Sequence, residues 1–235
     1  MFGLILAGGR GERLRPLTDN IPKPMAPLNG RPVLEYQVEW LRDGGVTEVV
    51  FLVGYRWQSV RDHFQDGQAF GIRAHYSVED SPLGRGGAVK KGLSVVTDAT
   101  APIVVTNGDT ITEEPLMTLL RRHDERTKKN PSHLVTMMVV PFVSPYSVIQ
   151  MDHQDQILDF EDSPHLPYWV NAGLYVMEGR VADDFPEIGD HETHTFPGLA
   201  RRSRILGVKS NKFWIGIDSF DDLHRAENYL NSRGR

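Results

Sequence analysis

The chain contains no cysteine. Disulfide bonds, thiolate chemistry and cysteine-ligated zinc are therefore excluded as sources of stability or function. No apolar run approaches the length of a membrane-spanning helix. The start of the chain lacks a basic region followed by a cleavage site, so it does not resemble a signal peptide. From these absences we expect a soluble cytoplasmic protein with no membrane partner.

The chain also lacks an excess of positive charge. It has 26 Lys and Arg against 31 Asp and Glu, which gives a formal net charge of -5. General nucleic-acid binders usually carry the opposite sign, so we expect no nucleic-acid partner. The 235 residues are 40% apolar, which is enough for a substantial core. No internal repeat or low-complexity linker divides them, and we predict a single domain over residues 1–235.

Apolar strands alternate with helical stretches in the first 140 residues. We predict strands at 2–7, 48–53, 73–78, 102–107 and 134–140, and helices at 33–41, 57–64, 86–96 and 116–128. Strands separated by helices predict an α/β three-layer sandwich with a mostly parallel sheet, whose ligands bind beyond the carboxyl ends of the strands.

The pattern changes after residue 140. Short strands are predicted at 148–152, 157–161 and 169–177, with turns between them, and a final helix at 219–230. This part would add antiparallel strands to the sheet, making it mixed, and would form the far wall of a ligand cleft.

A glycine-rich turn follows the first strand. Gly8, Gly9 and Gly11 allow backbone dihedrals that other residues avoid and leave room for a ligand against the main chain. Two cations, Arg13 and Lys23, stand close to this turn in the sequence. A strand, a glycine turn and nearby positive charge predict a polyphosphate site. The alternative is an ordinary strand-to-helix turn with two surface cations.

Two other glycine motifs do not fit this turn. A phosphate-binding loop of the G-x-x-x-x-G-K-[ST] type needs a Lys after its last glycine, and none follows Gly11. A dinucleotide-binding G-x-G-x-x-G would need a glycine where Leu14 stands.

The block from Leu6 to Thr18, followed by Pro22-Lys23-Pro24, resembles the sugar-1-phosphate nucleotidylyltransferase signature L-A-G-G-x-G-x-R-L-x-P-L-T with P-K-P. The resemblance implies a Rossmann-like fold of the nucleotide-diphospho-sugar transferase type, with residues 1–140 binding the nucleotide and residues 141–235 binding the sugar and closing the site. It implies a reaction of a nucleoside triphosphate with a sugar 1-phosphate, with Mg²⁺ as cofactor. A homodimer is left open. The residues it places at the nucleotide are Leu6, Ala7, Gly8, Gly9 and Gly11, with Arg13 at the leaving phosphates and Lys23 at the α-phosphate or the sugar phosphate.

Asn107-Gly108-Asp109 ends a predicted strand. Mg²⁺ bound to a nucleotide needs one or two carboxylate oxygens, and a carboxylate at a strand end points into the cleft. The motif resembles the G-D of the family, which implies that Asp109 holds the metal beside the substrate and that Gly108 contacts the nucleotide. The alternative is a simple strand-end turn.

The segment from Glu79 to Ala88 resembles the family's base-reading loop, E-x-x-P-L-G-T-x-G-A, with Arg85 in place of Thr. The resemblance places Glu79, Pro82, Gly84 and Gly87 at the nucleotide. A carboxylate only accepts hydrogen bonds, and guanine offers two adjacent donors, so Glu79 favours GTP if it reaches the base. A solvated surface Glu is the alternative. This loop and Asn107–Thr110 most resemble guanylyltransferases acting on heptose or mannose 1-phosphate.

Two motifs in the second part resemble the family's sugar contacts. Phe160–Pro164 stands where the family has F-x-E-K-P, which implies that Glu161 holds sugar hydroxyls. The Lys that would hold the sugar phosphate is replaced by Asp162, so another cation must serve, with Lys23, Arg85 and Lys212 as candidates. Asn171-Ala172-Gly173 resembles the N-x-G that touches the sugar, which implies sugar contacts for Asn171 and Gly173.

The last motif has an exchanged order. Family members read W-x-D-I-G-T, whereas here Gly216 takes the Asp position and Asp218 the Gly position. The segment is then similar to the V-D-T-P-E-D-L of related cytidylyltransferases, which implies that Asp218 is the second metal ligand. Alternatively, Asp218 only caps the final helix.

His191 and His194 have the spacing of a metal pair, but a polar loop is the better interpretation, since no third ligand accompanies them.

These departures keep two other functions open. One is a nucleotidylyltransferase that joins CTP to a cyclitol or choline phosphate, and the other is a nucleotide-sugar-binding regulatory subunit without turnover. A glycosyltransferase is disfavoured, since Asp109 is followed by Thr110-Ile111 and no D-x-D is formed.

Overall fold

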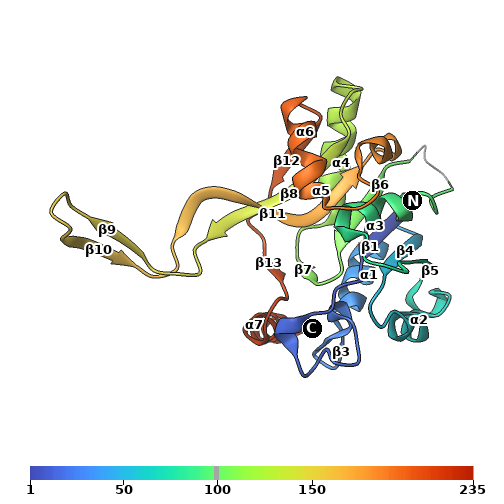
Figure 1. Cartoon of the computed structure of the whole chain (residues 1–235), viewed down its shortest axis with the longest axis horizontal. Coiled ribbons are helices and arrows are strands. Elements are labelled where there is room, and N and C mark those ends of the chain that lie inside the picture. The colour runs from blue at the N-terminus through green and yellow to red at the C-terminus, as the bar shows by residue number, and fades with distance from the viewer. Residues whose placement is uncertain (98–100, 235) are drawn as a thin grey trace.

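The computed structural model describes residues 1–97 and 101–234, so residues 98–100 and 235 of the predicted domain lie outside it. A seven-stranded sheet in the order β12-β8-β11-β6-β1-β4-β5 forms its centre (Figure 1). The strands are β1 Phe2–Leu6, β4 Glu48–Val53, β5 Arg73–Val78, β6 Ile103–Asn107, β8 Val135–Val143, β11 His165–Met177 and β12 Ile205–Lys209.

The sheet is mixed and mostly parallel, as predicted. β1 pairs in parallel with β4 and β6, β4 with β5, and β12 with β8. Only β11 runs antiparallel, and it does so to both of its neighbours, β6 and β8. The parallel strands are joined by helical crossovers, because two parallel neighbours cannot be connected by a tight turn.

The remaining elements cover the sheet or extend from it. The helices are α1 Val33–Asp43, α2 Gln58–Phe64, α3 Gly84–Leu93, α4 Leu116–Lys129, α5 His191–His194, α6 Phe196–Arg201 and α7 Phe220–Ser232. Three-residue or six-residue 3₁₀ helices occupy Glu12–Leu14, Lys23–Met25, Gln68–Phe70 and Gly179–Asp184. Short strands pair outside the main sheet: β2 Pro27–Leu28 with β3 Arg31–Pro32, β7 Thr110–Thr112 with β13 Trp214–Gly216, and β9 Val148–Met151 with β10 Ile157–Glu161.

Two apolar clusters lie on opposite faces of the sheet, which makes three layers. Successive strand residues point to opposite faces, so Phe51 and Leu52 of β4 enter different clusters. Phe51 belongs to the cluster that includes Leu34 of α1, and Leu52 to the one that includes Val89 of α3. The predicted three-layer sandwich is confirmed. Within residues 1–97 and 101–234, none of the helices has the length and hydropathy of a membrane-spanning segment.

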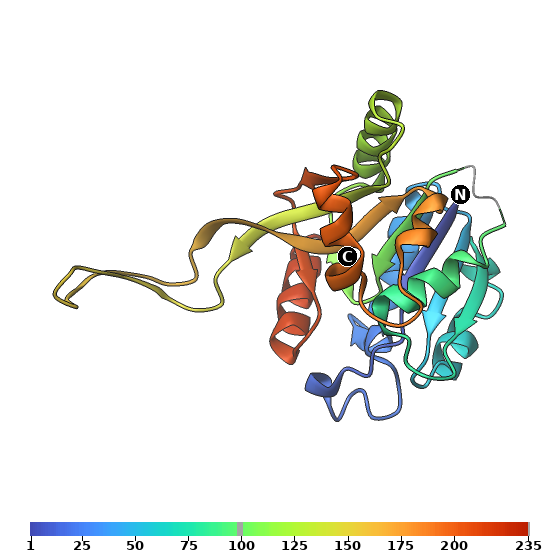
Figure 2. The same cartoon turned by 45° about the horizontal axis from the view of Figure 1, so that its top comes forward.

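The part after residue 140 departs from the prediction. The strands β9 and β10 do not form a wall against the main sheet but project from the body, in both views, as a two-stranded ribbon (Figures 1 and 2). The strands β8 and β11 extend beyond the neighbouring strands, and every residue of β10 is exposed. The inner half of β11, from Asn171 onward, is the segment that lies in the main sheet and reaches the ligand cleft.

A pair of buried histidines makes stability sensitive to acid. His123 and His133 both contact Thr136 Oγ1, at 3.0 and 2.9 Å. Burial, together with the nearby charges of His123, Arg126 and Arg180, lowers the pKa of His133 from 6.5 to about 4. A folded-state pKa below the unfolded one means that this stability is present above pH 6.5 and is lost as the pH falls toward 4.

We therefore expect the melting temperature to fall on acidification from pH 6.5 to 4, and a His133→Gln variant to show a shallower fall. The expected difference in slope is on the order of 2–4 °C per pH unit. Thermal melts monitored by circular dichroism across this range would measure it, with the exposed His153→Gln as the matched control. Parallel pH profiles for wild type and His133→Gln would contradict the prediction.

Candidate active site

A cavity of about 550 Å³ opens beyond the carboxyl ends of β1, β4 and β6, where a ligand site was predicted. Leu6, Leu52 and Asn107 line it from these three strands. Its other lining residues are Gly8, Gly9, Lys23, Pro24, Glu79, Pro82, Gly84, Arg85, Ala88, Asp109, Thr110, Asn171, Ala172, Gly173, Glu192, Trp214, Gly216 and Asp218. The cavity is walled both by the parallel part of the sheet and by β11.

The glycine turn after β1 is tied to the segment that carries Lys23. Lys23 N donates to Gly9 O at 2.9 Å, and Thr18 Oγ1 donates to Gly11 O at 2.7 Å. Gly11 has a φ of 65°, and a Cβ on it would lie 2.9 Å from Lys23 Cβ. Only glycine tolerates both the left-handed backbone and this close approach. The turn therefore brings the Lys23 side chain to the cavity.

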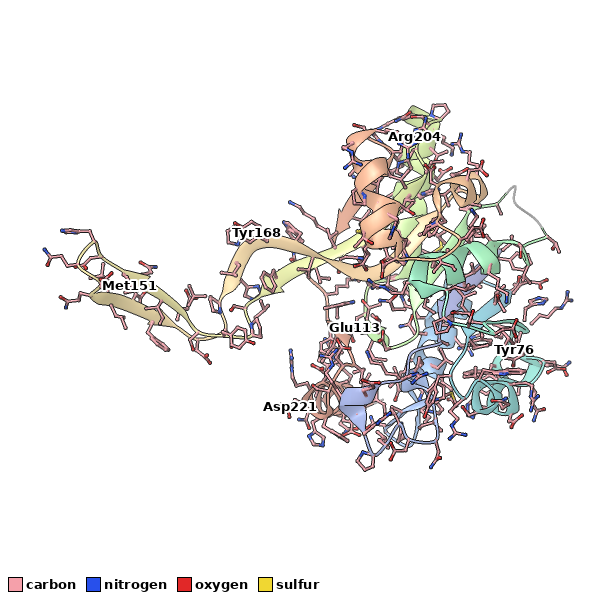
Figure 3. All side chains as sticks on the ribbon, in the orientation of Figure 1. Tyr76, Glu113, Met151, Tyr168, Arg204 and Asp221 are labelled. Carbon is pink, nitrogen blue, oxygen red and sulfur yellow. The ribbon has the colours of Figure 1, made fainter. Side chains whose placement is uncertain are left out.

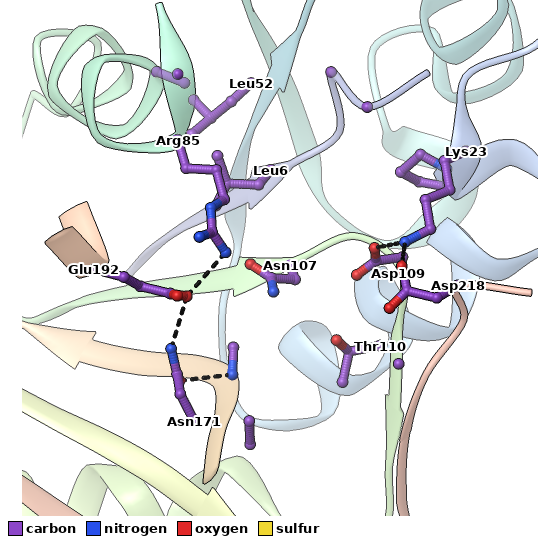
Figure 4. A pocket seen from close by; sticks show the side chains of 18 of the residues that line it. Leu6, Lys23, Leu52, Arg85, Asn107, Asp109, Thr110, Asn171, Glu192 and Asp218 are labelled. Atoms are coloured by element: carbon purple, nitrogen blue, oxygen red, sulfur yellow. Dashed lines mark hydrogen bonds and ion pairs between the residues drawn. The ribbon is translucent and has the colours of Figure 1, made fainter. Parts of the chain in front are cut away.

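One lysine bridges two carboxylates at the cavity. Lys23 Nζ lies 2.5 Å from Asp109 Oδ2 and also contacts Asp218 Oδ1 (Figure 4). Arg13 Nη2 lies 2.8 Å from the same Asp218 oxygen. Burial disfavours the charged ammonium, but the two carboxylates outweigh it and raise the pKa of Lys23. Burial likewise opposes ionisation of Asp218, but Lys23 and Arg13 lower its pKa. Lys23 and Asp218 therefore stabilise each other's charged form.

The two carboxylates meet because two distant segments pair. The strand β7 directly follows Asp109, and β13 ends two residues before Asp218. These strands pair antiparallel, and the ladder ends with a bond from Ile217 N to Asp109 O of 2.8 Å. The cap of α7 is Ser219, whose hydroxyl accepts from Asp222 N, so the alternative role of Asp218 as the helix cap is wrong. The Asp218 side chain is left for the cavity.

The donor chemistry of this pair suits Mg²⁺. Two carboxylates already share one cation, the Lys23 ammonium, and their side chains remain 25% and 49% exposed. Mg²⁺ binds one or two carboxylates and takes its other ligands from phosphates and water. Within the described ranges, no cluster of three or more His, Cys, Asp or Glu is arranged for a metal, so an all-protein cage is not what this site provides.

A second charged cluster lies across the cavity, centred on Arg85. Arg85 Nε donates to Asp190 Oδ2 at 2.6 Å and Nη1 to Glu192 Oε1 at 2.9 Å. Glu192 Oε1 also accepts from Asn171 Nδ2 at 2.9 Å. Burial opposes the charge on Arg85, but the two acids raise its pKa, while Arg85 lowers that of Asp190 against the effect of burial. Figure 4 shows Asn107 between this cluster and the Lys23 group.

The two acids of this cluster were missed by sequence reasoning. The predicted polar loop at 190–194 is the short helix α5, capped by Asp190, whose side chain accepts from Glu192 N. His191 is buried and packs on Tyr175, so it is not available as a metal ligand with His194. The sequence feature that could have pointed to these acids is Arg85, because an arginine among the glycines at the start of α3 is a candidate for an ion pair with a carboxylate.

The predicted base-reading loop lines the cavity through Glu79, Pro82 and Gly84. Glu79 Oε2 accepts from Leu83 N at 2.8 Å, which braces the loop and leaves Oε1 for other donors. Gly87 faces away from the cavity, and a Cβ on it would lie 2.4 Å from Glu187 O. Glycine at this position therefore lets α3 pack closely against the segment that contains Glu187.

Four other predicted residues shape or flank the cavity without lining it. Ala7 is buried and donates from its N to Leu52 O, and Gly108 N donates to Leu6 O. Gly11 forms the turn described above, and Arg13 is mostly exposed and pairs with Asp218. In this structure, Ala7, Gly11 and Gly108 set the geometry of the backbone around the cavity, and Arg13 lies next to the carboxylate of Asp218 at its edge.

Glu161 is not brought to this cavity. It lies in β10 on the projecting ribbon, is exposed, and is not among the residues that line the cavity. The carboxylate that faces Asn171 here is that of Glu192. Of the three cations considered for the sugar phosphate, Lys23 and Arg85 line the cavity, whereas Lys212 lines a separate cavity beside α1 and α7.

Comparison with known proteins gives a consistent family match. A family model described as nucleotidyl transferase matches residues 2–233. The D-glycero-alpha-D-manno-heptose 1-phosphate guanylyltransferase of Campylobacter jejuni is 34% identical over 187 residues, 79% of each chain. The mannose-1-phosphate guanyltransferase of Saccharomyces cerevisiae is 33% identical, and the UTP–glucose-1-phosphate uridylyltransferase of Synechocystis is 30% identical. These matches cover 99% and 96% of this chain but only 65% and 62% of the two relatives.

Solved structures show the same fold at lower sequence identity. HddC from Yersinia pseudotuberculosis, complexed with GMP-PN, superimposes with a TM-score of 0.72 at 22% identity, covering 97% of this chain and 99% of that one. A putative glucose-1-phosphate thymidylyltransferase from Bacillus anthracis gives a TM-score of 0.76 at 22% identity, covering 97% and 95%. At this identity, the likeness bears on the fold alone.

Proposed function

The chain belongs to the nucleotidyl transferase family, and we propose that it condenses GTP with a sugar 1-phosphate to give an NDP-sugar and pyrophosphate. The observation that carries the proposal is the composition of one cavity. It holds a glycine turn with Lys23 between two carboxylates on one side and the Arg85 cluster on the other. A site for two phosphate-bearing substrates needs cations at both ends, because the substrates repel each other.

On the nucleotide side, the turn at Gly8 and Gly9 would cradle the triphosphate and Lys23 would neutralise its α-phosphate. The oxygen of the sugar phosphate attacks the α-phosphorus in line, the bond to the bridging oxygen breaks, and pyrophosphate leaves toward Arg13. The attacking oxygen is already ionised at neutral pH, so no general base is required. Catalysis then rests on positioning and charge stabilisation.

Mg²⁺ would be held by Asp109 and Asp218, whose carboxylates both contact the ammonium of Lys23. When bound there, Mg²⁺ would neutralise part of the negative charge of the phosphates. Lys23 bridges these carboxylates in this structure, and an ammonium freed from them would be available for the nucleotide. The proposed Mg²⁺ site is therefore supported by two observations. The two groups are carboxylates, which Mg²⁺ prefers, and they lie close enough together to bind one cation, here the Lys23 ammonium.

Arg85 would take the sugar phosphate, in place of the Lys that Asp162 replaces. A guanidinium has five donors, and the structure uses two of its nitrogens for Asp190 and Glu192, which leaves donors for phosphate oxygens. Glu192 and Asn171 stand beside it as acceptor and donor for sugar hydroxyls. This assignment rests on the position of the cluster in the cavity.

The preference for GTP is supported by Glu79. Its carboxylate lines the cavity, and one of its oxygens is used by the loop. Guanine offers adjacent N1–H and amino donors to an acceptor-only group. Two of the relatives described above are named as guanylyltransferases, although the uridylyltransferase is nearly as similar.

A Glu79→Gln variant is expected to lower kcat/KM for GTP by roughly 10–100-fold, because it loses a hydrogen bond to a charged acceptor. The Gln carbonyl still accepts from Leu83 N, so the loop is retained. Measuring kcat/KM for GTP and UTP in both proteins would test this, with the neighbouring exposed Asp80→Asn as control. An unchanged GTP-to-UTP ratio would contradict base reading by Glu79.

The function itself is tested by pyrophosphate release from each of GTP, UTP, CTP, ATP and dTTP with mannose, heptose or glucose 1-phosphate and Mg²⁺. We expect the fastest release with GTP. Product with CTP and choline or cyclitol phosphate instead would favour the non-sugar alternative, and binding without release would favour a regulatory subunit. Two departures motivate both alternatives, the exchanged Gly216 and Asp218 and the Lys that is missing at Asp162. The first is weakened because Asp218 lines the cavity.

A further inference from the structure

Gly108 and Asp109 form a short turn between β6 and β7, which we call the Asp109 turn. One polar residue of α1 holds this turn from outside the cavity. Gln37 is 1% exposed, its Nε2 donates to Thr110 O, and its Oε1 accepts from Thr106 Oγ1 at 2.8 Å. These two threonines belong to β7 and β6, so Gln37 is bonded to both strands that flank the turn. Figure 4 labels Asp109 and Thr110.

A polar side chain is unexpected at this position of the helix. Residue 37 belongs to the buried face of α1, together with Leu34, Val38 and Leu41. A buried amide must satisfy both of its ends with hydrogen bonds, whereas an apolar residue would simply extend the core. Because replacing a buried hydrogen-bonded pair by apolar groups of the same shape can be almost neutral, stability alone does not account for the amide. The amide adds direction, since its donor and its acceptor each fix one strand.

A second side chain of α1 holds the other end of β7. Trp40, one helical turn after Gln37, donates from Nε1 to Glu114 O at 2.7 Å. Glu113, which directly follows β7 and is labelled in Figure 3, donates from its N to Phe213 O at 3.0 Å, just before β13. The helix therefore holds β7 at both ends, and β7 in turn holds β13.

The Asp109 turn has no free space around it. Gly108 N donates to Leu6 O at 3.0 Å, and a Cβ on Gly108 would lie 2.9 Å from that oxygen. The same Cβ would lie 3.2 Å from Leu34 Cδ1 of α1. The turn thus lies between β1 and α1. Because Asp109 is the next residue, a shift of the turn moves its carboxylate.

The position of Asp109 also affects that of Asp218. Asp109 O accepts from Ile217 N at 2.8 Å, and Lys23 Nζ contacts both carboxylates. A displacement of the turn would be passed through this backbone bond to the residue before Asp218. Mg²⁺ demands near-ideal geometry with ligands at about 2.1 Å, so small shifts of its carboxylates weaken its binding.

We propose that Gln37 is a positioning residue for the reaction: its bonds to β6 and β7 fix where the carboxylates of Asp109 and Asp218 lie. This role presupposes the proposed function, in which these two groups hold Mg²⁺. Gln37 is not one of the described residues that line the cavity, so it acts through the turn rather than by contact with a substrate. Replacing an outer partner of a metal ligand typically costs roughly 10–100-fold in metal affinity or activity.

Gln37→Met tests this role, because Met has a similar length and suits the buried face but makes neither hydrogen bond. We expect kcat to fall by roughly 10–100-fold, with both KM values close to those of wild type. Thr106→Val removes only one of the two bonds and should cause a smaller fall, and it keeps the test possible if Gln37→Met does not fold. The double variant should be no slower than Gln37→Met, because the two changes remove the same bond.

The matched control is Thr136→Val. Thr106 and Thr136 are both fully buried in strands, and their hydroxyls meet a side chain of a covering helix, Gln37 of α1 and His123 of α4. Thr136 lies in β8, away from the Asp109 turn, so Thr136→Val should keep the wild-type kcat. Thermal melts of all variants would compare their losses of stability. An equal fall of kcat in Thr136→Val and Thr106→Val would overturn the proposal, because loosening any buried strand would then suffice.

A second readout follows the metal rather than turnover. Calorimetric titration with GTP, in the absence of sugar phosphate, is carried out once with Mn²⁺ and once with EDTA. Gln37→Met should weaken the binding of Mn²⁺–GTP by roughly tenfold and leave the binding of metal-free GTP unchanged. Asp109→Ala gives the loss expected when the ligand itself is absent.

The two levels of the hypothesis fail differently. Unchanged Mn²⁺–GTP binding in Asp109→Ala would overturn the metal site of the proposed function. A loss in Asp109→Ala, with wild-type kcat and wild-type Mn²⁺–GTP affinity in folded Gln37→Met and Thr106→Val proteins, would overturn the positioning role of Gln37 alone.

Discussion

Replacing Lys23 with alanine is expected to lower kcat by roughly 10²–10³-fold, the usual cost of removing one preorganised charge from a transition state. The residue is held by the glycine turn through its own backbone, and its ammonium lies between Asp109 and Asp218. Its loss removes the cation that would neutralise the α-phosphate. It also leaves the carboxylates of Asp109 and Asp218 without the ammonium that both contact. Asp109→Ala is expected to reduce kcat by a similar factor, through the loss of a metal ligand.

Pyrophosphate release at saturating GTP and sugar phosphate would measure the effect of Lys23→Ala. The matched control is Lys128→Ala, since Lys128 also contacts a carboxylate, Asp124, but lies on α4 outside the cavity. Thermal melts of both variants would verify folding. Near-normal kcat in a folded Lys23→Ala protein would rule out the proposed role of the ammonium.

Replacing Arg85 with alanine is expected to raise KM for the sugar phosphate by roughly 10–100-fold, the effect of one lost hydrogen bond to a charged group. KM for GTP should change less, because Arg85 faces Asn171 and Glu192 across the cavity from the Lys23 group (Figure 4). The variant also leaves Asp190 and Glu192 facing the acceptor without a cation, which adds repulsion. Steady-state kinetics with each substrate varied in turn would separate the two KM values.

Arg202→Ala is the matched control for Arg85. Arg202 also pairs with an aspartate, Asp184, at 2.5 Å and has a similar exposure of 47% against 43%, but it lies outside the cavity. Arg85→Lys should recover part of the loss, since it keeps the charge without the planar fork. Equal changes in both KM values would show that Arg85 acts on the loop rather than on the acceptor.

Local sequence patterns were enough to predict the strands and helices of the central part of the fold. The apolar run at Phe2–Leu6 and the alternation of strands and helices up to residue 140 predicted β1, β4, β5, β6 and β8 to within a few residues. β1, β4 and β6 are buried over nearly their whole length, so their hydrophobicity alone reveals them, whereas β5 lies at the edge of the sheet and is only partly buried. Boundaries were less exact, as for α3, which begins at Gly84 rather than at 86.

Candidate site residues could be predicted from the sequence where their motif lies within one short segment. Gly8, Glu79 and Asp109 line the cavity because each lies just after a strand of the parallel part of the sheet. Lys23 lines it because its backbone N donates to Gly9 O. Their predicted chemical roles stay predictions. Glu192 was missed, because its relation to Arg85 spans 107 positions and depends on how α5 packs against α3.

Pattern and composition determined the class of fold, the place of the ligand cavity and the absence of any cysteine chemistry, since each follows from local residue type and spacing. The tertiary structure decided what depends on distant pairing. It placed Asp218 beside Asp109 through the β7–β13 ladder, and it gave Arg85 two acids from another element. It also left the ribbon of β9 and β10 outside the body, where large apolar side chains such as Phe160 stay exposed. Contacts between segments far apart in the chain are set by packing, which a local pattern does not encode.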